Sequence, residues 1–224
     1  TTDNGGPTQL CAVQGSSNRH RGGKCTVWEG GTTGDALISG PVLDFPSNRF
    51  DGLMHAVDWL PTLAAIVGAR PNGKRLDGVD QLGALLGADP SPRTEVFVGY
   101  AKYESSWYGP AVRWKNWKLL QGHSGGPEDP ENFLPGTPEP ATGGDAQANY
   151  ILYDVDRDPY ETTDISLYNP LIVQILQTKL REYSKTYVPP IANDPDCTPF
   201  RGIVNNSEFG RVWSPWCSEL IVYN

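Results

Sequence analysis

The chain begins with a polar turn whose side chains are suited to binding a hard cation. Asp3 offers a carboxylate and Asn4 a carbonyl oxygen, and Gly5 and Gly6 follow directly. Ca²⁺ and Mg²⁺ prefer oxygen ligands of these kinds, and glycine permits the sharp backbone path that brings such ligands together. Asn-Gly is also a common turn dipeptide. On its own, the stretch is therefore typical of an ordinary turn.

A second glycine-rich stretch, RGGKCTVWEGG at residues 21–31, contains the cationic residue Lys24. Gly22 and Gly23 precede the lysine and would let the backbone approach a ligand closely. Other basic residues lie nearby, and a lysine in a basic run is usually a solvated surface group. We interpret the stretch as a loop around one short strand at 25–30. Its residues alone leave open whether Lys24 binds an anion or only water.

The composition is that of an acidic globular protein. The chain has 224 residues, enough for one large domain or two small ones, and 38 % of them are hydrophobic, so it can bury a core. The net charge of −8 argues against a nucleic-acid-binding surface. No apolar run approaches the roughly 20 residues of a membrane-spanning helix. We therefore expect neither a nucleic-acid partner nor a membrane span.

The cysteines and one sequon favour an oxidising compartment. No two cysteines have C-x-x-C spacing, which disfavours a zinc or thioredoxin-type site. Asn205 begins an N-glycosylation sequon, and a sequon with an even cysteine count favours a secreted or lysosomal protein. Because the chain has no initiator Met and no signal-peptide pattern, we expect a mature or partial product. The four cysteines are Cys11, Cys25, Cys197 and Cys217.

Hydrophobic patterning changes character at about residue 90. Before it, short apolar runs are bounded by glycine and proline; after it, β-branched and aromatic residues predict antiparallel strands followed by the best helix of the chain. A long loop rich in Pro and Gly is expected at 125–147, and an irregular tail after the helix. The predicted elements are a buried strand at 36–43, a helix beginning near Pro61, a helix at 80–87, strands within 94–100, 110–122 and 148–156, and a helix at 170–187 with an apolar stripe of Ile172, Ile175, Leu176 and Leu180.

Two other patterns imitate metal sites but have simpler explanations. His55 and Asp58 stand at helical spacing, and we interpret them as residues that cap and orient the start of the first helix. Asp154 and Asp158, with an aspartate between them, imitate the beginning of an EF-hand loop. Proline and isoleucine, however, stand where that loop needs glycine and a bidentate glutamate. We predict instead a strand that runs into a turn beginning at Asp158.

Four stretches of the chain form an ordered set of motifs. They are TTDNGG at 1–6, RGGKCTVWEGG at 21–31, MHAVDWLPTL…LDGVD at 54–80 and AVRWKNWKLL…LYDVDRDPYETTDIS at 111–166. Each motif alone is weakly specific, but four in this order are strong. Together they resemble the C-terminal part of the sulfatases, with the greatest likeness to the arylsulfatase B group. The likeness runs from Thr1 to about Trp216 and includes the late DPDC…VWSPW tail.

The resemblance implies an α/β fold in two parts. Residues 1–90 would complete the large mixed-sheet, alkaline-phosphatase-like domain of the sulfatases. Residues 91–224 would form a smaller α+β domain with an antiparallel sheet of about four strands, the long helix packed on it and an irregular tail. The strand that should precede the first turn is then expected in a portion of the protein before Thr1.

The resemblance also implies roles for three residues. In sulfatases the D-N-G-G turn supplies ligands of a divalent cation, which implies Asp3 and Asn4 as ligands here, with Ca²⁺ favoured over Mg²⁺. The lysine of the R-G-G-K loop contacts the sulfate group in that family, which implies the same role for Lys24. Such groups suit sulfate ester cleavage because negative charge develops on the leaving oxygen as the S–O bond breaks.

The sulfatase nucleophile is a formylglycine made from the cysteine of a C-x-P-S-R motif. Cys197 begins the sequence C-T-P-F-R, which fits only a looser form of the motif and lies in the tail. The arylsulfatase B group has a structural cysteine here, so we interpret Cys197 as a disulfide cysteine and expect the nucleophile outside this chain. The expected partners are the N-terminal portion of the same precursor, possibly disulfide-linked, and a sulfated small molecule or glycan as substrate.

The disulfide pairing has one physical argument. Cys11 and Cys25 flank a 13-residue polar loop, and a bridge across it would contribute roughly 3 kcal/mol in the chain-entropy model. We predict this bridge. The resemblance implies that Cys197 pairs with a cysteine of the N-terminal portion, and Cys217 is expected to do the same, with a Cys197–Cys217 bond as the alternative. A companion chain is also expected because residues 1–90 alone would expose an unpaired sheet edge.

The leading hypothesis is the C-terminal part of a secreted or lysosomal arylsulfatase-type hydrolase of sulfuric esters. The alternative is a catalytically inactive sulfatase-like extracellular protein that binds anionic glycans or has a structural role. An unrelated β-rich secreted module would require four ordered motifs to coincide by chance. A C-x-P-S-R motif with an Asp-Asp pair in the preceding sequence would favour the enzyme. The sequence identifies neither the substrate nor the oligomeric state.

Overall fold

The structure is a computed structural model. In it the chain forms two compact units, Thr1–Tyr183 and Ser184–Asn224. The predicted domain boundary near residue 90 lies inside the first unit and stays a prediction. The structure describes residues 1–2, 4–6, 20–24, 26–41, 49–70, 75–99, 101–103, 106–122, 150–186, 203–206 and 210–213, and for 101–103, 106–108, 203–206 and 210–213 it describes the backbone alone.

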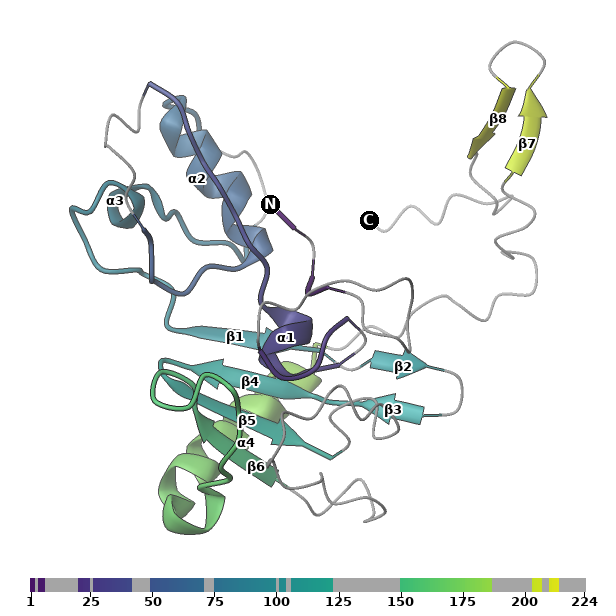
Figure 1. Cartoon of the computed structure of the whole chain (residues 1–224). Helices are drawn as coiled ribbons and strands as arrows, with labels where there is room; N and C mark the ends of the chain where they lie inside the picture. The colour runs from purple at the N-terminus through teal and green to yellow at the C-terminus, as the bar shows by residue number, and fades with distance from the viewer. Residues whose placement is uncertain are drawn as a thin grey trace. The chain divides into compact units, whose positions relative to one another are not determined.

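A four-stranded antiparallel sheet is the centre of the first unit (Figure 1). The strand order is β1-β4-β5-β6, and Ala111 on β4 faces Leu120 on β5, which in turn faces Ile151 on β6. This confirms the antiparallel strands and the approximate strand number expected from the sequence. The strands are β1 at Glu95–Val98, β4 at Ala111–Trp114, β5 at Trp117–Gln121 and β6 at Tyr150–Asp154.

The long helix α4, Pro170–Ser184, covers one face of this sheet. Proline opens the helix, where its missing N–H costs nothing. Leu176 and Leu180 pack against one face of the sheet. The next residues along each strand point to the opposite face, because side chains alternate along a strand. Ile175, expected in the apolar stripe, is 41 % exposed because it lies at the edge of the helical face that contacts the sheet. The sheet side of this core is Val112, Leu119 and Leu152.

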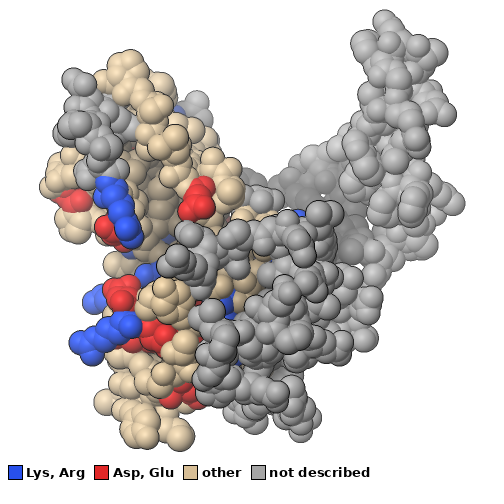
Figure 2. Space-filling model, in the orientation of Figure 1, with Lys and Arg blue, Asp and Glu red and all other residues tan. Residues whose placement is uncertain are grey.

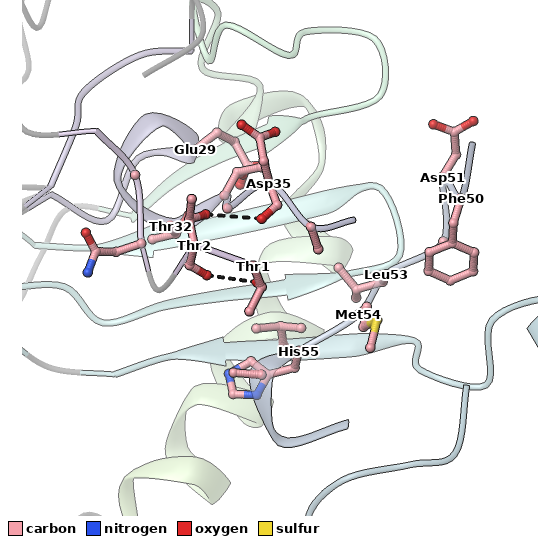
Figure 3. Close-up of a pocket in the computed structure, with 18 of the residues that line it drawn as sticks. Thr1, Thr2, Glu29, Thr32, Asp35, Phe50, Asp51, Leu53, Met54 and His55 are labelled. Carbon is pink, nitrogen blue, oxygen red and sulfur yellow. Dashed lines mark hydrogen bonds between the residues drawn. The ribbon is translucent and has the colours of Figure 1, made fainter. Parts of the chain in front are cut away.

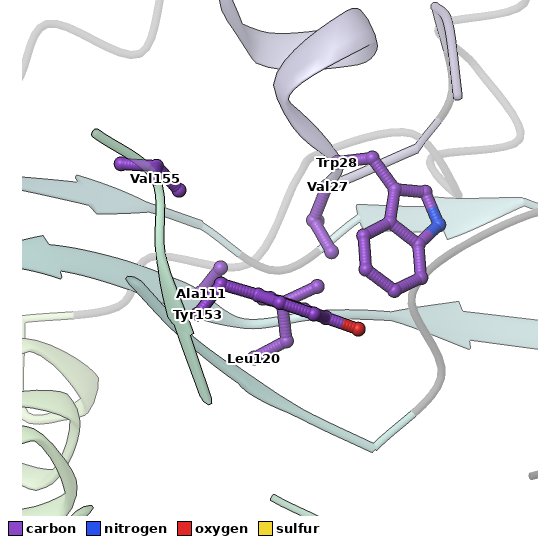
Figure 4. Close-up of a cluster of buried hydrophobic side chains, with 6 residues drawn as sticks. All are labelled: Val27, Trp28, Ala111, Leu120, Tyr153 and Val155. Atoms are coloured by element: carbon purple, nitrogen blue, oxygen red, sulfur yellow. The ribbon is translucent and has the colours of Figure 1, made fainter. Parts of the chain in front are cut away.

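The opposite face of the sheet carries a short segment around α1, Glu29–Thr32 (Figures 1 and 4). Val27 and Trp28 pack there on a cluster formed with Ala111, Leu120, Tyr153 and Val155. The strand predicted at 25–30 is wrong, because residues 26–28 form bends and a helical turn follows. Gly30 and Gly31 lie so close to the carbonyls of residues 21–23 and 26 that neither position has room for a side chain.

The helical part of the first unit precedes the sheet in sequence. Its elements are η1 at Ala56–Asp58, α2 at Trp59–Ile66 and α3 at Leu82–Leu85. The predicted helix start near Pro61 and the helix within 80–87 are confirmed. The strand predicted at 36–43 is wrong in its described part: residues 36–41 form no strand, and most are exposed, so this run finds no sheet partner among the described residues.

Two hairpins were not predicted. β2 at Ala101–Tyr103 pairs with β3 at Ser106–Tyr108 in the first unit. In the second unit, β7 at Ile203–Asn206 pairs with β8 at Gly210–Trp213, where an irregular tail was expected. Val204 is the register partner of Val212. Asparagines and a glycine near these valines make the sequence signal for strands weak. A further single turn, η3, spans Ser166–Tyr168.

The larger architecture implied by the resemblance is only partly visible. The antiparallel sheet with its packed helix is present. No strand forms in the described part of residues 1–90, so the end of a large mixed sheet stays a prediction. Of the helices described, none combines the length and hydropathy needed to cross a bilayer.

Candidate functional site

A cavity of about 1540 Å³ lies in the first unit, on the sheet face that carries α1. Val96 and Val98 of β1 and Val155 line it, and these residues alternate with those that contact α4. Figure 3 shows part of the lining, where Thr2 lies next to Asp35. There, Thr2 Oγ1 donates a hydrogen bond to the Asp35 carbonyl at 3.3 Å.

The cavity brings together the two turns that the sequence singled out. The backbone N–H of Lys24 donates to the carbonyl of Gly6 at 2.9 Å, so the second turn is held directly against the first. Asn4 is half-buried and Lys24 is exposed, and both line the cavity. The turns that carry Asn4 and Lys24 therefore lie next to each other at the lining of one cavity.

Glycine is required where the first turn crosses α1. Gly5 donates its N–H to the carbonyl of Gly31 at 3.0 Å. A Cβ on Gly5 would collide with the carbonyl of Gly30, and backbone cannot move aside as a flexible side chain can. The D-N-G-G sequence thus permits a backbone approach that a larger residue would prevent.

Several predicted site residues lie outside the described part of the structure. They are Asp3 and the cysteines Cys11, Cys25, Cys197 and Cys217; for Asn205 only the backbone, in β7, is described. The metal role of Asp3, all the disulfides and the glycan acceptor therefore stay predictions. Among the described residues, no three His, Cys, Asp or Glu side chains gather as a metal site.

A buried ionic cluster that sequence reasoning missed lies at the sheet side of the cavity. The Lys118 Nζ atom is 2.8 Å from Glu29 Oε1 and 2.9 Å from Glu161 Oε1. All three residues are buried. The Lys118–Glu29 contact is a hydrogen bond, whereas Glu161 Oε1 contacts the ammonium as an ion pair without hydrogen-bond alignment. Arg113 adds a positive charge 3.5 Å from Glu29 Oε2.

The charges of this cluster stabilise one another unequally. Burial disfavours the charged form of Glu29, but Lys118 and Arg113 outweigh it and lower its pKa to about 2. Burial likewise disfavours charged Lys118, and its two carboxylate partners outweigh that effect and raise its pKa. For Glu161, burial and the charge of Glu29 outweigh the attraction of Lys118, so its pKa is raised. Glu161 is thus the member that most readily takes up a proton.

One sequence signal could have found part of this cluster. Lys118 is two residues before Leu120, and in a strand both side chains point to the same face. A lysine in a core-facing position needs a buried carboxylate partner. Nothing in the sequence indicates which carboxylates those are, because Glu29 is 89 positions away.

The two imitations of metal sites have the structural roles expected of them. His55 and Asp58 form a reciprocal capping box at the start of η1, which confirms the capping interpretation. Asp58 is fully buried and binds Arg93 through two contacts of 2.6 and 2.5 Å. Asp158 accepts the N–H groups of Thr162 and Thr163, each at 2.8 Å, and so shapes the predicted turn.

Charged side chains of the described residues do not gather by sign on the face of the molecule drawn in Figure 2. On the face shown in Figure 2, basic and acidic side chains of the described residues lie next to one another. Arg113, for example, contacts both Glu29 and the exposed Asp156.

Comparison with known proteins identifies relatives of one kind. No protein-family profile matches the chain. It is 31 % identical to mouse arylsulfatase J over 98 % of this chain and 39 % of the relative, and 34 % identical to human arylsulfatase A over 74 % of this chain and 32 % of the relative. Rat steryl-sulfatase is 26 % identical over 66 % of this chain and 26 % of the relative. The chain thus spans at most about two fifths of the length of these relatives.

Solved structures give weaker similarities. A structure from a study of glycosaminoglycan metabolism by Bacteroides thetaiotaomicron matches 58 % of this chain and 24 % of its own, with 23 % identity and a TM-score of 0.40. A phosphonate monoester hydrolase of Agrobacterium radiobacter matches 70 % of this chain and 28 % of its own, with 17 % identity and a TM-score of 0.36. These scores are too low to establish a shared fold.

The sequence relatives and the ordered motifs agree. The named relatives are arylsulfatases and a steryl-sulfatase, and the alignment to arylsulfatase J extends over nearly the whole chain. The chain belongs to the sulfatase family.

Proposed function

We propose that this chain is the C-terminal part of an arylsulfatase-type hydrolase of sulfuric esters. In this proposal Asp3 and Asn4 are ligands of a divalent cation, Ca²⁺ before Mg²⁺, and Lys24 contacts the sulfate group. One observation carries the proposal: in a relative of arylsulfatases, the Asn4 and Lys24 turns are hydrogen-bonded to each other and line the same cavity.

The chemistry of the donors fits both ligands. Asn4 offers a hard carbonyl oxygen at the cavity wall, as Ca²⁺ prefers. A bound divalent cation would supply positive charge toward the sulfate oxygens and the nucleophile. Lys24 donates N–H groups from a fixed, exposed position, and its charge counters the negative charge that develops on the ester oxygens as the S–O bond breaks. The backbone N–H of Lys24 donates to the Gly6 carbonyl, so the residue is anchored at the cavity through its main chain.

The remaining catalytic groups belong to the rest of the protein. The nucleophile is a formylglycine in the N-terminal portion of the same precursor, which is also the partner that completes the site. The complete protein is a disulfide-bonded glycoprotein, secreted or lysosomal, with a glycan on Asn205 and a sulfated small molecule or glycan as substrate. The four cysteines and the sequon support this setting.

Replacing Lys24 by alanine tests the proposal. In the full protein, Lys24→Ala should lower kcat/KM for an aryl sulfate by about 10²-fold or more, because a donor aimed at developing charge is lost. Lys115→Ala is the matched control, since Lys115 is an exposed lysine on the β4–β5 turn outside the cavity. Equal kcat/KM in Lys24→Ala, Lys115→Ala and the unmodified protein would contradict the role of Lys24.

The metal role needs its own measurement. Asp3→Ala should abolish hydrolysis and weaken Ca²⁺ binding, measured by calorimetric titration of metal-free full protein, while the protein stays folded. Unchanged Ca²⁺ affinity in this variant would contradict the ligand assignment. If the unmodified full protein binds Ca²⁺ and a sulfated glycan but hydrolyses no sulfate ester, the catalytically inactive alternative is correct.

A further inference from the structure

We propose that Lys118 is a positioning residue that holds Asn4 and Lys24 in place through α1. The inference rests on the proposed function for the roles of Asn4 and Lys24, but not for its geometry. Lys118 lies on β5, points to the same face as the core residue Leu120, and is 1 % exposed. Its ammonium group lies between two carboxylates from two distant segments, Glu29 on α1 and Glu161 after β6.

The cluster binds α1 to the sheet through both the side chain and the backbone of Glu29. Glu29 binds Lys118 through its side chain, and its backbone N–H donates to Glu161 Oε2 at 2.7 Å. The carbonyl of Glu161 accepts a hydrogen bond of 2.8 Å from Arg21 Nη1, and the Arg21 guanidinium stacks over Trp28 at 3.9 Å from the ring centroid. Both ends of the segment from Arg21 to α1 therefore bind one residue, Glu161.

From α1, hydrogen bonds continue to both proposed site residues. The carbonyl of Gly31 accepts the N–H of Gly5, next to Asn4, at 3.0 Å. The carbonyl of Gly6 then accepts the N–H of Lys24 at 2.9 Å. Gly30 donates to the Arg21 carbonyl at 2.8 Å and so fixes the start of the lysine turn. A movement of α1 would thus move both turns together.

Energetics make Lys118 the sensitive member of the cluster. Removing the lysine would leave two buried carboxylates without their shared cation, and an uncompensated buried charge is strongly unfavourable. Relief would come from protonation of a carboxylate or from movement of α1 toward water. Either change weakens the contacts that hold Glu29 and with it the two turns.

The experiment compares Lys118→Met with Lys179→Met in the full protein. Methionine has nearly the shape of lysine without its charge. Lys179 forms an ion pair with Glu95 at the edge of the opposite face of the sheet, so it is the matched control. Amide hydrogen exchange is measured at Gly5, Lys24 and Gly30, and in parallel within β4 and β5. Hydrolysis of an aryl sulfate gives kcat and KM.

Lys118→Met should raise the exchange rates of the Gly5, Lys24 and Gly30 amides by about tenfold or more, with a smaller change within β4 and β5. It should lower kcat by about 10²-fold with little change in KM, because small misplacement of reacting groups mainly costs rate. Lys179→Met should change neither readout. Exchange that rises equally in the turns and in the strands, with kcat retained, would show a purely structural role and overturn the inference.

A second variant keeps the test decisive if Lys118→Met does not fold. Glu161→Gln retains the shape of the side chain and a carbonyl oxygen for the Glu29 N–H. Like Lys118→Met, it should raise the amide exchange rates of Gly5 and Lys24. Unchanged exchange and kcat in Glu161→Gln would overturn the inference. The exchange result is independent of activity, so loss of turn protection in a protein whose Lys24→Ala variant keeps full kcat/KM would reject the proposed function and retain the positioning role.

Discussion

The two faces of the four-stranded sheet are built differently. Toward α4, Leu176 and Leu180 pack on an aliphatic core, and the Glu95–Lys179 pair lies partly exposed at its edge. Toward α1, apolar packing of Val27 and Trp28 is combined with the fully enclosed Lys118 cluster, and the cavity opens on this side. One face thus places its charges where water screens them, and the other encloses them beside the candidate site.

Burying the charges of Lys118, Glu29 and Glu161 costs desolvation energy, but their directional contacts fix the position of α1. Aliphatic packing is non-directional, so the position of α4 is set by how its side chains fit against those of the sheet. Hydrogen bonds weaken steeply away from good distances and angles, and those made by Glu29 favour one orientation of α1.

The largest effect on stability is expected at the α4 face. Leu176→Ala removes a fully buried side chain, and it should lower the free energy of unfolding by about 2–5 kcal/mol, as for other large-to-small core changes. Aryl sulfate hydrolysis well below the unfolding temperature should keep its kcat, because the residue does not line the cavity. A kcat that falls while the protein remains folded would show that the two faces are coupled.

The α1 face should respond to pH. The pKa of Glu29 is lowered from 4.5 to about 2, so its ionised form stabilises the fold above pH 4.5 by roughly 3 kcal/mol, and this contribution is lost as the pH falls toward 2. The raised pKa of Glu161 acts in the opposite sense, and because the charge of Glu29 contributes to that rise, Glu29→Gln changes both contributions. Denaturant titrations between pH 5 and 2 should show a shallower loss of stability in Glu29→Gln, and parallel curves would contradict the assignment.

The smallest effect is expected for the exposed ion pair of the α4 face. The side chains of Lys179 and Glu95 are 27 % and 31 % exposed, and such pairs contribute at most about 1 kcal/mol. Lys179→Met should therefore lower the unfolding free energy by no more than that, and the loss should shrink at high salt. If Lys179→Met lowered the unfolding free energy as much as Lys118→Met does, the exposure of an ion pair would not predict its contribution to stability.

Local sequence rules predicted most of the sheet and its helix. The partial alternation within 110–122 and 148–156 predicted strands, and the apolar stripe of 170–187 predicted α4, because periods of 2 and 3.6 are properties of the backbone itself. The caps at His55 and Asp58 were predicted for the same reason, since their partners lie within three residues. The same rules failed at 25–30 and 36–41, where β-branched and apolar residues suggested strands but no neighbouring strand receives them among the described residues.

By itself, the sequence determined the family, the antiparallel strands, the long helix and the two glycine-rich turns that carry Asn4 and Lys24. Only the tertiary structure decided that these turns meet in one cavity and that Lys118 is enclosed between Glu29 and Glu161. The physical reason is separation along the chain: Glu29 and Glu161 are 132 positions apart, and a period shows which way a side chain points but not what will cover it. Whether a lysine is solvated or buried with two carboxylates depends on those distant partners.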